Sequence, residues 1–496
     1  MIRSGILLGT LALLLPGQEA RAESSSATVA GISIERLNVF DPSVTGEDWW
    51  PFRMANLIHI KTRKSVVLHE VLISPGSRFD DLKAIETERN LRSLGFIRHA
   101  ELRPIPRPDG KLDLRVRTQD SWTLMPQFGV GTEGGDNFFI AGIREGNLLG
   151  YGKEISYFHS EVGPTVRNEL RYSDPRVWNS WYGLLTHFAD TSRGSEVGVR
   201  LSNPFVSFAS RWASDVSWAK INEEQELFQS AETTSKFDLD FRAVRSLGAV
   251  RVGRSRRFVQ RVQAGTLFER YRFGAKTETA AGTLPSDRTL SGPLVGYSWI
   301  QPKYLKETEI NSMQRVEDFN LGNEFMIDAG PMLKSWGSDR DRWIGSALMQ
   351  QGLRLAPGRF ILAQAGVQGR LAGRVVENAI FFSNLNLVWK TEWPFRQTFV
   401  SHLEWNTTRR LDGEKQLALG GSAGLRGYKN DSFTGDKVVL LNFEDRVFHD
   451  RDFFHLLYLG GVVFFDAGIV QAKGARLSLR QFKSDVGFGL RFSPSR

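Results

Sequence analysis

Phe237-Asp-Leu-Asp-Phe-Arg-Ala243 alternates apolar and polar residues without a break. In an extended strand the apolar side chains of this stretch fall on one face and the charged side chains on the other. The same period of two recurs between Trp122 and Phe492, for example at 361–371, 385–390 and 402–406, with Gly, Asp, Asn, Ser and Pro between the stretches. This pattern predicts a mainly β fold for residues 121–496.

The repeated strands fit two closed architectures, a soluble sandwich or barrel and a transmembrane barrel. An expected strand length of ~9–12 residues is enough for a tilted strand to cross a bilayer. Tryptophan and tyrosine near the strand ends favour the membrane, where such residues form interfacial girdles. They include Trp178, Trp181, Tyr182, Trp389, Trp393 and Trp405. We therefore predict a transmembrane antiparallel β-barrel of about 16 strands.

The last predicted strand carries Asp485-x-Gly487-x-x-Leu490-x-Phe492. A polar residue, a glycine and a terminal aromatic residue in this order are typical of an outer-membrane export signal. We therefore assign Gly487, Leu490 and Phe492 to a C-terminal barrel signal.

The amino-acid composition excludes several other classes of protein. The chain has 496 residues with 41% hydrophobic residues, 24% charged residues, a net charge of +9 and no cysteine. Beyond the first twenty residues or so there is no run of ~18 apolar residues, which excludes a helical membrane bundle. The lack of cysteine excludes disulfides, a cysteine-ligated zinc site and a lipid-modified N-terminal cysteine. The basic residues do not form a block, so we expect no nucleic-acid partner, and a basic total suits anionic lipid headgroups.

The first 22 residues are typical of a secretory signal peptide. Arg3 precedes an apolar stretch from Gly5 to Leu15, and Ala20-Arg-Ala22 resembles a cleavage site. The apolar stretch is too short to span a bilayer as a helix. We expect the mature chain to begin at Glu23.

Residues 23–120 predict a small α/β domain. We expect strands at 31–40, 97–103 and 111–118, and helices at 63–72 and 79–94. A turn-rich insert with Trp49 and Trp50 separates the first strand from the first helix. The domain therefore mixes helices with a small sheet, in contrast to the strands that follow.

The chain offers no constellation typical of an enzyme. Gly129-Val-Gly-Thr-Glu-Gly134 matches the spacing of a dinucleotide fingerprint, but a strand follows it where that fingerprint requires a helix. The eight histidines show no metal-ligand spacing, and no serine–histidine pair stands out. We expect a glycine-rich strand and hairpin turn at 129–134, and a non-enzymatic protein without metal or cofactor.

One loop carries a sharper signal, Gly420-Gly-Ser-Ala-Gly-Leu-Arg-Gly-Tyr428 between two predicted strands. A loop this rich in glycine can fold back into a barrel lumen at little steric cost. Arg426 at its tip would then need a carboxylate partner, because a guanidinium away from water is costly unless paired. Asp466, on a following strand, is the candidate partner.

These motifs resemble the BamA/TamA superfamily of outer-membrane assembly factors, the bacterial surface antigen family. Leu425-Arg426-Gly427-Tyr428 is similar to the tip of that family's inward-folded sixth extracellular loop. Phe464-Phe465-Asp466-Ala467-Gly468 resembles the wall motif whose aspartate pairs with the loop arginine. Residues 88–96 and the two strands after them are similar to a polypeptide-transport-associated (POTRA) domain.

The resemblance implies a protein of a Gram-negative outer membrane, with its POTRA domain in the periplasm. It implies insertion of outer-membrane proteins or translocation of polypeptides through a weak seam between the first and last barrel strands. The partners expected on this basis are client polypeptides, membrane lipids and periplasmic accessory proteins. A transporter dedicated to one secreted protein and a passive channel remain the alternatives.

The sequence departs from the family pattern in two respects. Only one POTRA-like domain is visible, whereas the principal assembly factors carry several. Two further strands usually follow the segment that resembles 482–492, whereas this sequence stops at Arg496. We expect a different allocation of strands, a shortened member of the family or a fragment.

Overall fold

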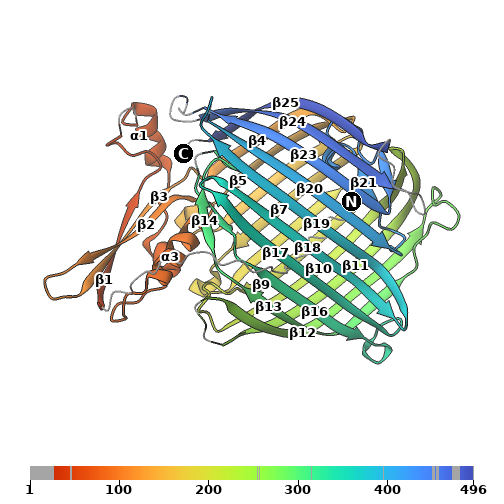
Figure 1. The fold of residues 1–496 in the computed structure, drawn as a ribbon, viewed down its shortest axis with the longest axis horizontal. Helices are drawn as coiled ribbons and strands as arrows, with labels where there is room; N and C mark the ends of the chain where they lie inside the picture. Colours follow the sequence, from red (N-terminus) through yellow and green to blue (C-terminus); the bar gives the residue numbers. More distant parts are fainter. Residues whose placement is uncertain are drawn as a thin grey trace.

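The computed structural model describes residues 27–44, 47–253, 255, 257–313, 315–394, 396–449, 453, 457–471 and 481–494. The chain forms a small N-terminal unit beside a large antiparallel sheet of 18 strands (Figure 1). The predicted signal peptide, residues 1–22, lies outside the described residues.

The N-terminal unit holds a three-stranded sheet in the order β1 (Val29–Leu37), β3 (Leu112–Asp120), β2 (Ile97–Pro106). Strand β1 is parallel to β3, and β2 is antiparallel to it. Helices α2 (Lys64–Glu70) and α3 (Asp81–Ser93) pack against this sheet around a common apolar core. The side chain of Asp80 caps α3 by accepting hydrogen bonds from two backbone N–H groups. The predicted strands and helices of this region are therefore present.

One element was not predicted. Helix α1 (Trp50–Ile58) begins at the end of the insert, residues 41–51, that the sequence indicated as turn-rich. Pro51 at the start of the helix explains both observations, because proline is typical of turns and also fits the first helical turn.

The large sheet contains 18 strands where about 16 were predicted. They are β4 (Leu124–Glu133), β5 (Asp136–Glu145), β6 (Glu154–Val162), β7 (Thr165–Asp174), β8 (Gly183–Thr191), β9 (Gly194–Asn203), β10 (Trp212–Gln229), β11 (Glu232–Val252), β12 (Val259–Ala275), β13 (Arg288–Ile300), β16 (Glu324–Met332), β17 (Arg342–Ala356), β18 (Arg359–Ala372), β19 (Val375–Thr391), β20 (Gln397–Arg409), β23 (Lys437–Phe448), β24 (Leu457–Gln471) and β25 (Lys483–Pro494). The glycine-rich stretch 129–134 lies in β4 and its turn into β5, as predicted.

Several strands are longer than the ~9–12 residues expected from the sequence. Strand β11 has 21 residues, and β12 and β19 have 17 each. Residues such as Ser246 and Gly248 are typical of turns, but here they continue the ladder between β11 and β12. Each strand pairs with its neighbour along the chain from β4 to β25, and β4 and β25 are neighbours in the closed order.

The outward face of the sheet is apolar. Every one of the 18 strands carries at least one large apolar residue that is more than about a third exposed. In β25 the outward residues are Val486, Phe488, Leu490 and Phe492, and the residues between them, such as Asp485, lie on the other face. Among the described residues, no helix is both long and apolar enough to cross a membrane.

The N-terminal unit lies at one end of the barrel (Figure 1), which we call the domain side. A short hairpin of β14 (Tyr304–Glu307) and β15 (Glu317–Asn320) joins β13 to β16 there. The longest described far-side connection is the loop 410–436 between β20 and β23. It contains the short pair β21 (Leu417–Leu419) and β22 (Phe433–Gly435).

Candidate functional site

The loop 410–436 folds back against the inner face of the barrel wall, and its glycines permit the close approach. Gly424 adopts a φ of +107°, and a Cβ atom placed on it would meet the Leu440 side chain of β23 at 2.2 Å. Leu425, the next residue, is fully buried in a cluster with Leu419, Val438 and Leu440. The glycine-rich sequence is therefore needed here for contact between backbone and wall, as well as for turns.

Arg426 is held by two carboxylates of the wall. Its Nε and Nη2 atoms each donate to Asp466 at 2.7 Å, and its Nη1 donates to Glu444 at 2.7 Å. The Asp466 side chain is fully buried, and Asn442 donates to it at 2.7 Å. The structure thus brings the predicted Arg426–Asp466 pair together in a bidentate arrangement, which is the strongest geometry for such a pair. The sequence analysis did not find Glu444 as a second partner.

The wall motif supports this arginine in two further ways. The Arg426 guanidinium lies 3.6 Å from the centroid of the Phe464 ring. Gly487 of β25 leaves room for that ring, since a Cβ there would lie 2.3 Å from its Cζ. Gly468 likewise leaves room for Leu419, whose Cδ1 would meet an added Cβ at 2.8 Å. Two glycines of the predicted motifs therefore shape the wall to fit the loop.

Other residues of the predicted motifs lie on the opposite face of the wall. Phe465, between Phe464 and Asp466, is 40% exposed on the outward face. Leu490 and Phe492 are also outward and exposed. These three residues cannot touch the loop, because alternate residues of a strand point to opposite faces.

Beyond Arg426 the loop contacts both strands of the β4–β25 junction. The Tyr428 hydroxyl donates to the backbone oxygen of Ser484 in β25 at 3.3 Å. The Asn430 backbone N–H donates to the Gly134 oxygen, in the turn after β4, at 2.9 Å. A Cβ on Gly427 would lie 2.7 Å from the Cβ of Asp485. The loop therefore bridges the first and last strands of the barrel.

The outward side chains at this junction are unusually exposed. Phe128 of β4 is 73% exposed and Phe488 of β25 is 85% exposed, whereas Leu385 of β19 and Leu403 of β20 are each 41% exposed. Side chains on paired strands normally cover one another. The β4–β25 junction is therefore the least covered outward seam among these strands.

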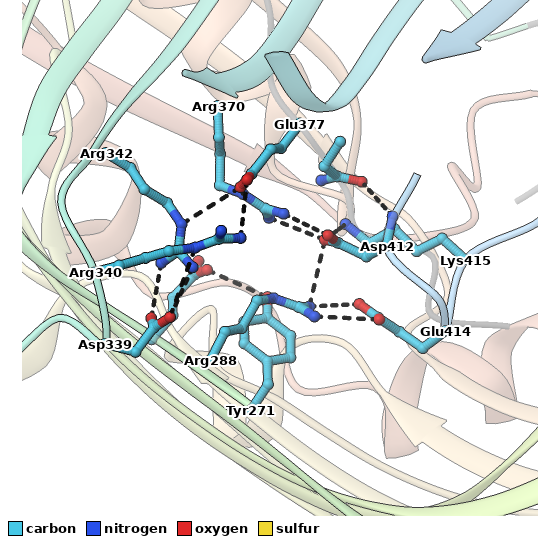
Figure 2. A network of polar contacts seen from close by, with 12 residues as sticks. Tyr271, Arg288, Asp339, Arg340, Arg342, Arg370, Glu377, Asp412, Glu414 and Lys415 are labelled. Atoms are coloured by element: carbon cyan, nitrogen blue, oxygen red, sulfur yellow. Dashed lines mark hydrogen bonds and ion pairs between the residues drawn. The ribbon is translucent and has the colours of Figure 1, made fainter. Parts of the chain in front are cut away.

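The base of the loop has a second anchor, which the sequence analysis missed. Figure 2 shows Arg288 of β13 and Arg370 of β18 pointing toward Asp412 and Glu414 of the loop. Arg370 donates to Asp412 at 2.9 Å, and Arg288 also lies 3.7 Å from the centroid of the Tyr271 ring. All four charged side chains are about nine-tenths buried or more. The pairs join residues 42 and 126 positions apart, so no local sequence pattern indicates them.

The N-terminal unit is fixed to the domain side of the barrel by buried polar contacts. Arg92 of α3 donates to Asp318 of β15 at 3.0 and 3.2 Å, with side-chain exposures of 8% and 15%. Glu70 of α2 pairs with Arg176 in the turn between β7 and β8. Burial raises the pKa of Glu70, and the nearby Arg176 guanidinium opposes that rise. These contacts give the unit a defined position on the barrel.

The segment between β14 and β15 extends from that docking surface across the barrel mouth. The Ile310 backbone oxygen accepts from Arg446 of β23, and the Asn311 oxygen accepts from Arg491 of β25 at 3.0 Å. Arg446 also donates to Glu444 at 2.7 Å, and Glu444 is the second partner of Arg426. A continuous chain of polar contacts therefore leads from α3 through this segment to the loop tip.

The described ranges contain no cluster of side chains suited to a metal ion. No group of three or more histidine, aspartate or glutamate side chains is arranged there to hold a metal ion. A cavity of about 320 Å³ lies beside Arg426, lined in part by His402, Asn442 and Glu444. The arrangement suits positioning of a loop.

Three solved structures align with most of this chain at low sequence identity. No model of a protein family and no curated protein matches the sequence. BamA from Haemophilus ducreyi lacking POTRA domains 1-3 aligns at 10% identity and a TM-score of 0.39, covering 93% of this chain and 85% of its own. CdiB from Acinetobacter baumannii aligns at 9% identity and a TM-score of 0.47, and the alignment covers 94% of this chain and 74% of that protein. CdiB from Escherichia coli aligns at 11% identity and a TM-score of 0.44, and the alignment covers 97% of this chain and 87% of that protein. At these scores the alignments assign no activity to this chain.

Proposed function

We propose that this protein is an outer-membrane factor that inserts or translocates other polypeptides, without enzymatic chemistry. The membrane location is supported by the outward apolar residues on every strand of the barrel. A water-soluble protein rarely exposes an apolar band of this extent. In this proposal the bilayer is that of a Gram-negative outer membrane, and the N-terminal unit is a POTRA domain in the periplasm.

The observation that carries the proposal is the inward loop and its position at the seam. Arg426 fixes the loop to β24, and the loop then contacts Ser484 of β25 and Gly134 after β4. This arrangement holds the two strands of the seam from the inside, while their outward side chains stay poorly covered. A seam held in this way can open toward the bilayer without unfolding the other strand pairs.

The N-terminal unit offers client chains a place to bind. Strands β1 and β2 are the two outer strands of its sheet. An outer strand presents unpaired backbone groups to which an extended chain can add as another strand. Its docking through Arg92 and Glu70 would deliver such a chain to the barrel mouth.

A passive channel fits the structure less well. The loop 410–436 lies inside the barrel from the far side, and the segment at Ile310 and Asn311 lies across the domain-side mouth. Both occupy space that a steady pore would need. Purified protein in planar bilayers should therefore show little steady conductance.

Depletion of the protein in the bacterium that encodes it tests the function. The outer-membrane and secreted proteomes are quantified before growth slows. Broad loss of other barrel proteins would support assembly, whereas loss of one or a few secreted proteins with barrels intact would support a dedicated transporter. An unchanged proteome in both fractions would refute the proposal.

A further inference from the structure

Helix α1 presents an apolar stripe to its surroundings. Trp50, Met54, Leu57 and Ile58 are 67%, 52%, 77% and 70% exposed. Their spacing places them on one side of the helix. The opposite side is also apolar, because Phe52 is buried there against Val39 and Phe40. A helix on a soluble domain normally buries its apolar side and exposes its polar side.

Exposed apolar residues also lie on the domain-side rim of the barrel. The segment after α1 is tied to the turn between β5 and β6, where Arg63 donates to the Leu149 oxygen at 3.2 Å and lies 3.8 Å from the centroid of the Tyr151 ring. Ile60, Leu149 and Tyr151 are 52%, 55% and 44% exposed. In the next domain-side turn Trp178 is 92% exposed. These residues add exposed apolar surface at the domain-side rim, where the segment after α1 is attached.

The charge around the stripe favours an anionic partner. Between Trp49 and Lys64 the sequence holds four cations, Arg53, Lys61, Arg63 and Lys64, and no acidic residue. Arg53 lies on the exposed side of α1, beside the stripe, and its guanidinium is 3.9 Å from Asp48, so the net positive charge comes from Lys61, Arg63 and Lys64. Basic residues next to an apolar helical face with tryptophan are typical of helices that lie in the interface of an anionic bilayer.

We propose that α1 docks on the surface of the lipid bilayer, with its stripe among the headgroups of the leaflet on the domain side. Figure 1 shows α1 projecting from the N-terminal unit, away from its sheet. The inner side of α1 packs with Trp122, which lies two residues before the start of β4. A membrane-bound α1 therefore tethers the unit to lipid beside the first strand of the seam. This inference uses the barrel's membrane location and no client activity.

The absence of cysteine from the sequence permits a direct test. Leu57→Cys in the full chain is labelled with an environment-sensitive fluorophore, and the protein is reconstituted in vesicles of phosphatidylethanolamine and phosphatidylglycerol. The matched control is Lys111→Cys, an exposed site in the turn between β2 and β3. We expect a blue shift and quenching by lipid-attached quenchers at position 57, and quenching by iodide alone at position 111.

A second pair of variants separates docking from folding. Met54→Glu should abolish lipid quenching at position 57, whereas Leu82→Glu, at a 48% exposed leucine of α3, should leave it intact. Equal iodide quenching at 57 and 111 would overturn the proposal. Shielding of position 57 from iodide in detergent that grows with protein concentration would indicate that a second copy covers α1, and would also overturn the proposal. Shielding that requires an added unfolded barrel protein would indicate that a client covers α1, with the same consequence.

Discussion

Replacing Arg426 by alanine is expected to make the inward loop mobile while leaving the barrel folded. The side chain makes three hydrogen bonds of 2.7 Å to Asp466 and Glu444 and covers the Phe464 ring. Its loss leaves the fully buried Asp466 carboxylate with Asn442 as its remaining side-chain partner among these residues. The strand ladders on both sides do not depend on Arg426, so the barrel should persist.

The free-energy cost of Arg426→Ala follows from the burial of the Arg426–Asp466 ion pair. Removing one partner of a buried ion pair costs ~3–5 kcal/mol. The Arg426 side chain is 34% exposed, and solvent screening lowers the expected cost to ~2–3 kcal/mol. That range corresponds to a rise of roughly 30- to 150-fold in the opening equilibrium of the loop. Burial of Leu425 continues to favour the docked loop, so complete detachment is not expected.

Amide hydrogen exchange of residues 417–436 measures this equilibrium in the intact barrel. Arg426→Ala should accelerate exchange by about two orders of magnitude, and a complementation assay should show reduced function. Arg426→Lys keeps the charge but loses the bidentate geometry, so its exchange rate should lie between those of the unchanged protein and Arg426→Ala. Arg409→Ala, at an exposed arginine at the end of β20, is the control. Unchanged exchange with full complementation, or a barrel that fails to fold, would refute the reasoning.

Three further predictions follow from the contacts. Gly487→Val should displace the Phe464 ring and weaken loop docking, seen as faster exchange at 417–436, whereas a valine at the exposed position Lys437 should not. Arg92→Ala leaves Asp318 uncompensated and should weaken docking of the N-terminal unit by ~2–4 kcal/mol, measured by exchange in α3 and β15. Burial lowers the pKa of His59, so His59 binds a proton less readily in the folded unit than in the unfolded chain. The stability of the unit to denaturant should therefore fall as the pH drops below the ordinary histidine pKa of 6.5. His59→Gln should make that stability less dependent on pH.

Alternation and turn residues were enough to predict the fold class, because each wall residue faces either lumen or exterior. The same rule predicts that Asp466 and Phe464 share a face with the loop while Phe465 does not. Strand length was underestimated, because a serine or glycine inside a long antiparallel strand, such as Gly248, keeps its ladder pairing. The amino-acid composition of such a stretch does not distinguish the interior of a long strand from a turn.

The contacts that position the site were harder to predict. Arg288 and Glu414 are 126 residues apart and meet only because the loop folds inward. Asp318 meets Arg92 only after the N-terminal unit docks on the barrel. A charged residue at an inward position is visible in the sequence, but its partner is set by the closed arrangement of strands.

The central claim is that client polypeptides engage the seam between β4 and β25. A photoreactive amino acid at Phe488, on the outward face of β25, tests it most directly in growing cells, with Leu385 of β19 as the matched outward control. The account predicts crosslinks from position 488 to other polypeptides during active synthesis, and none from position 385. Folded protein that yields no polypeptide adduct at 488, or equal adducts at both positions, would contradict it.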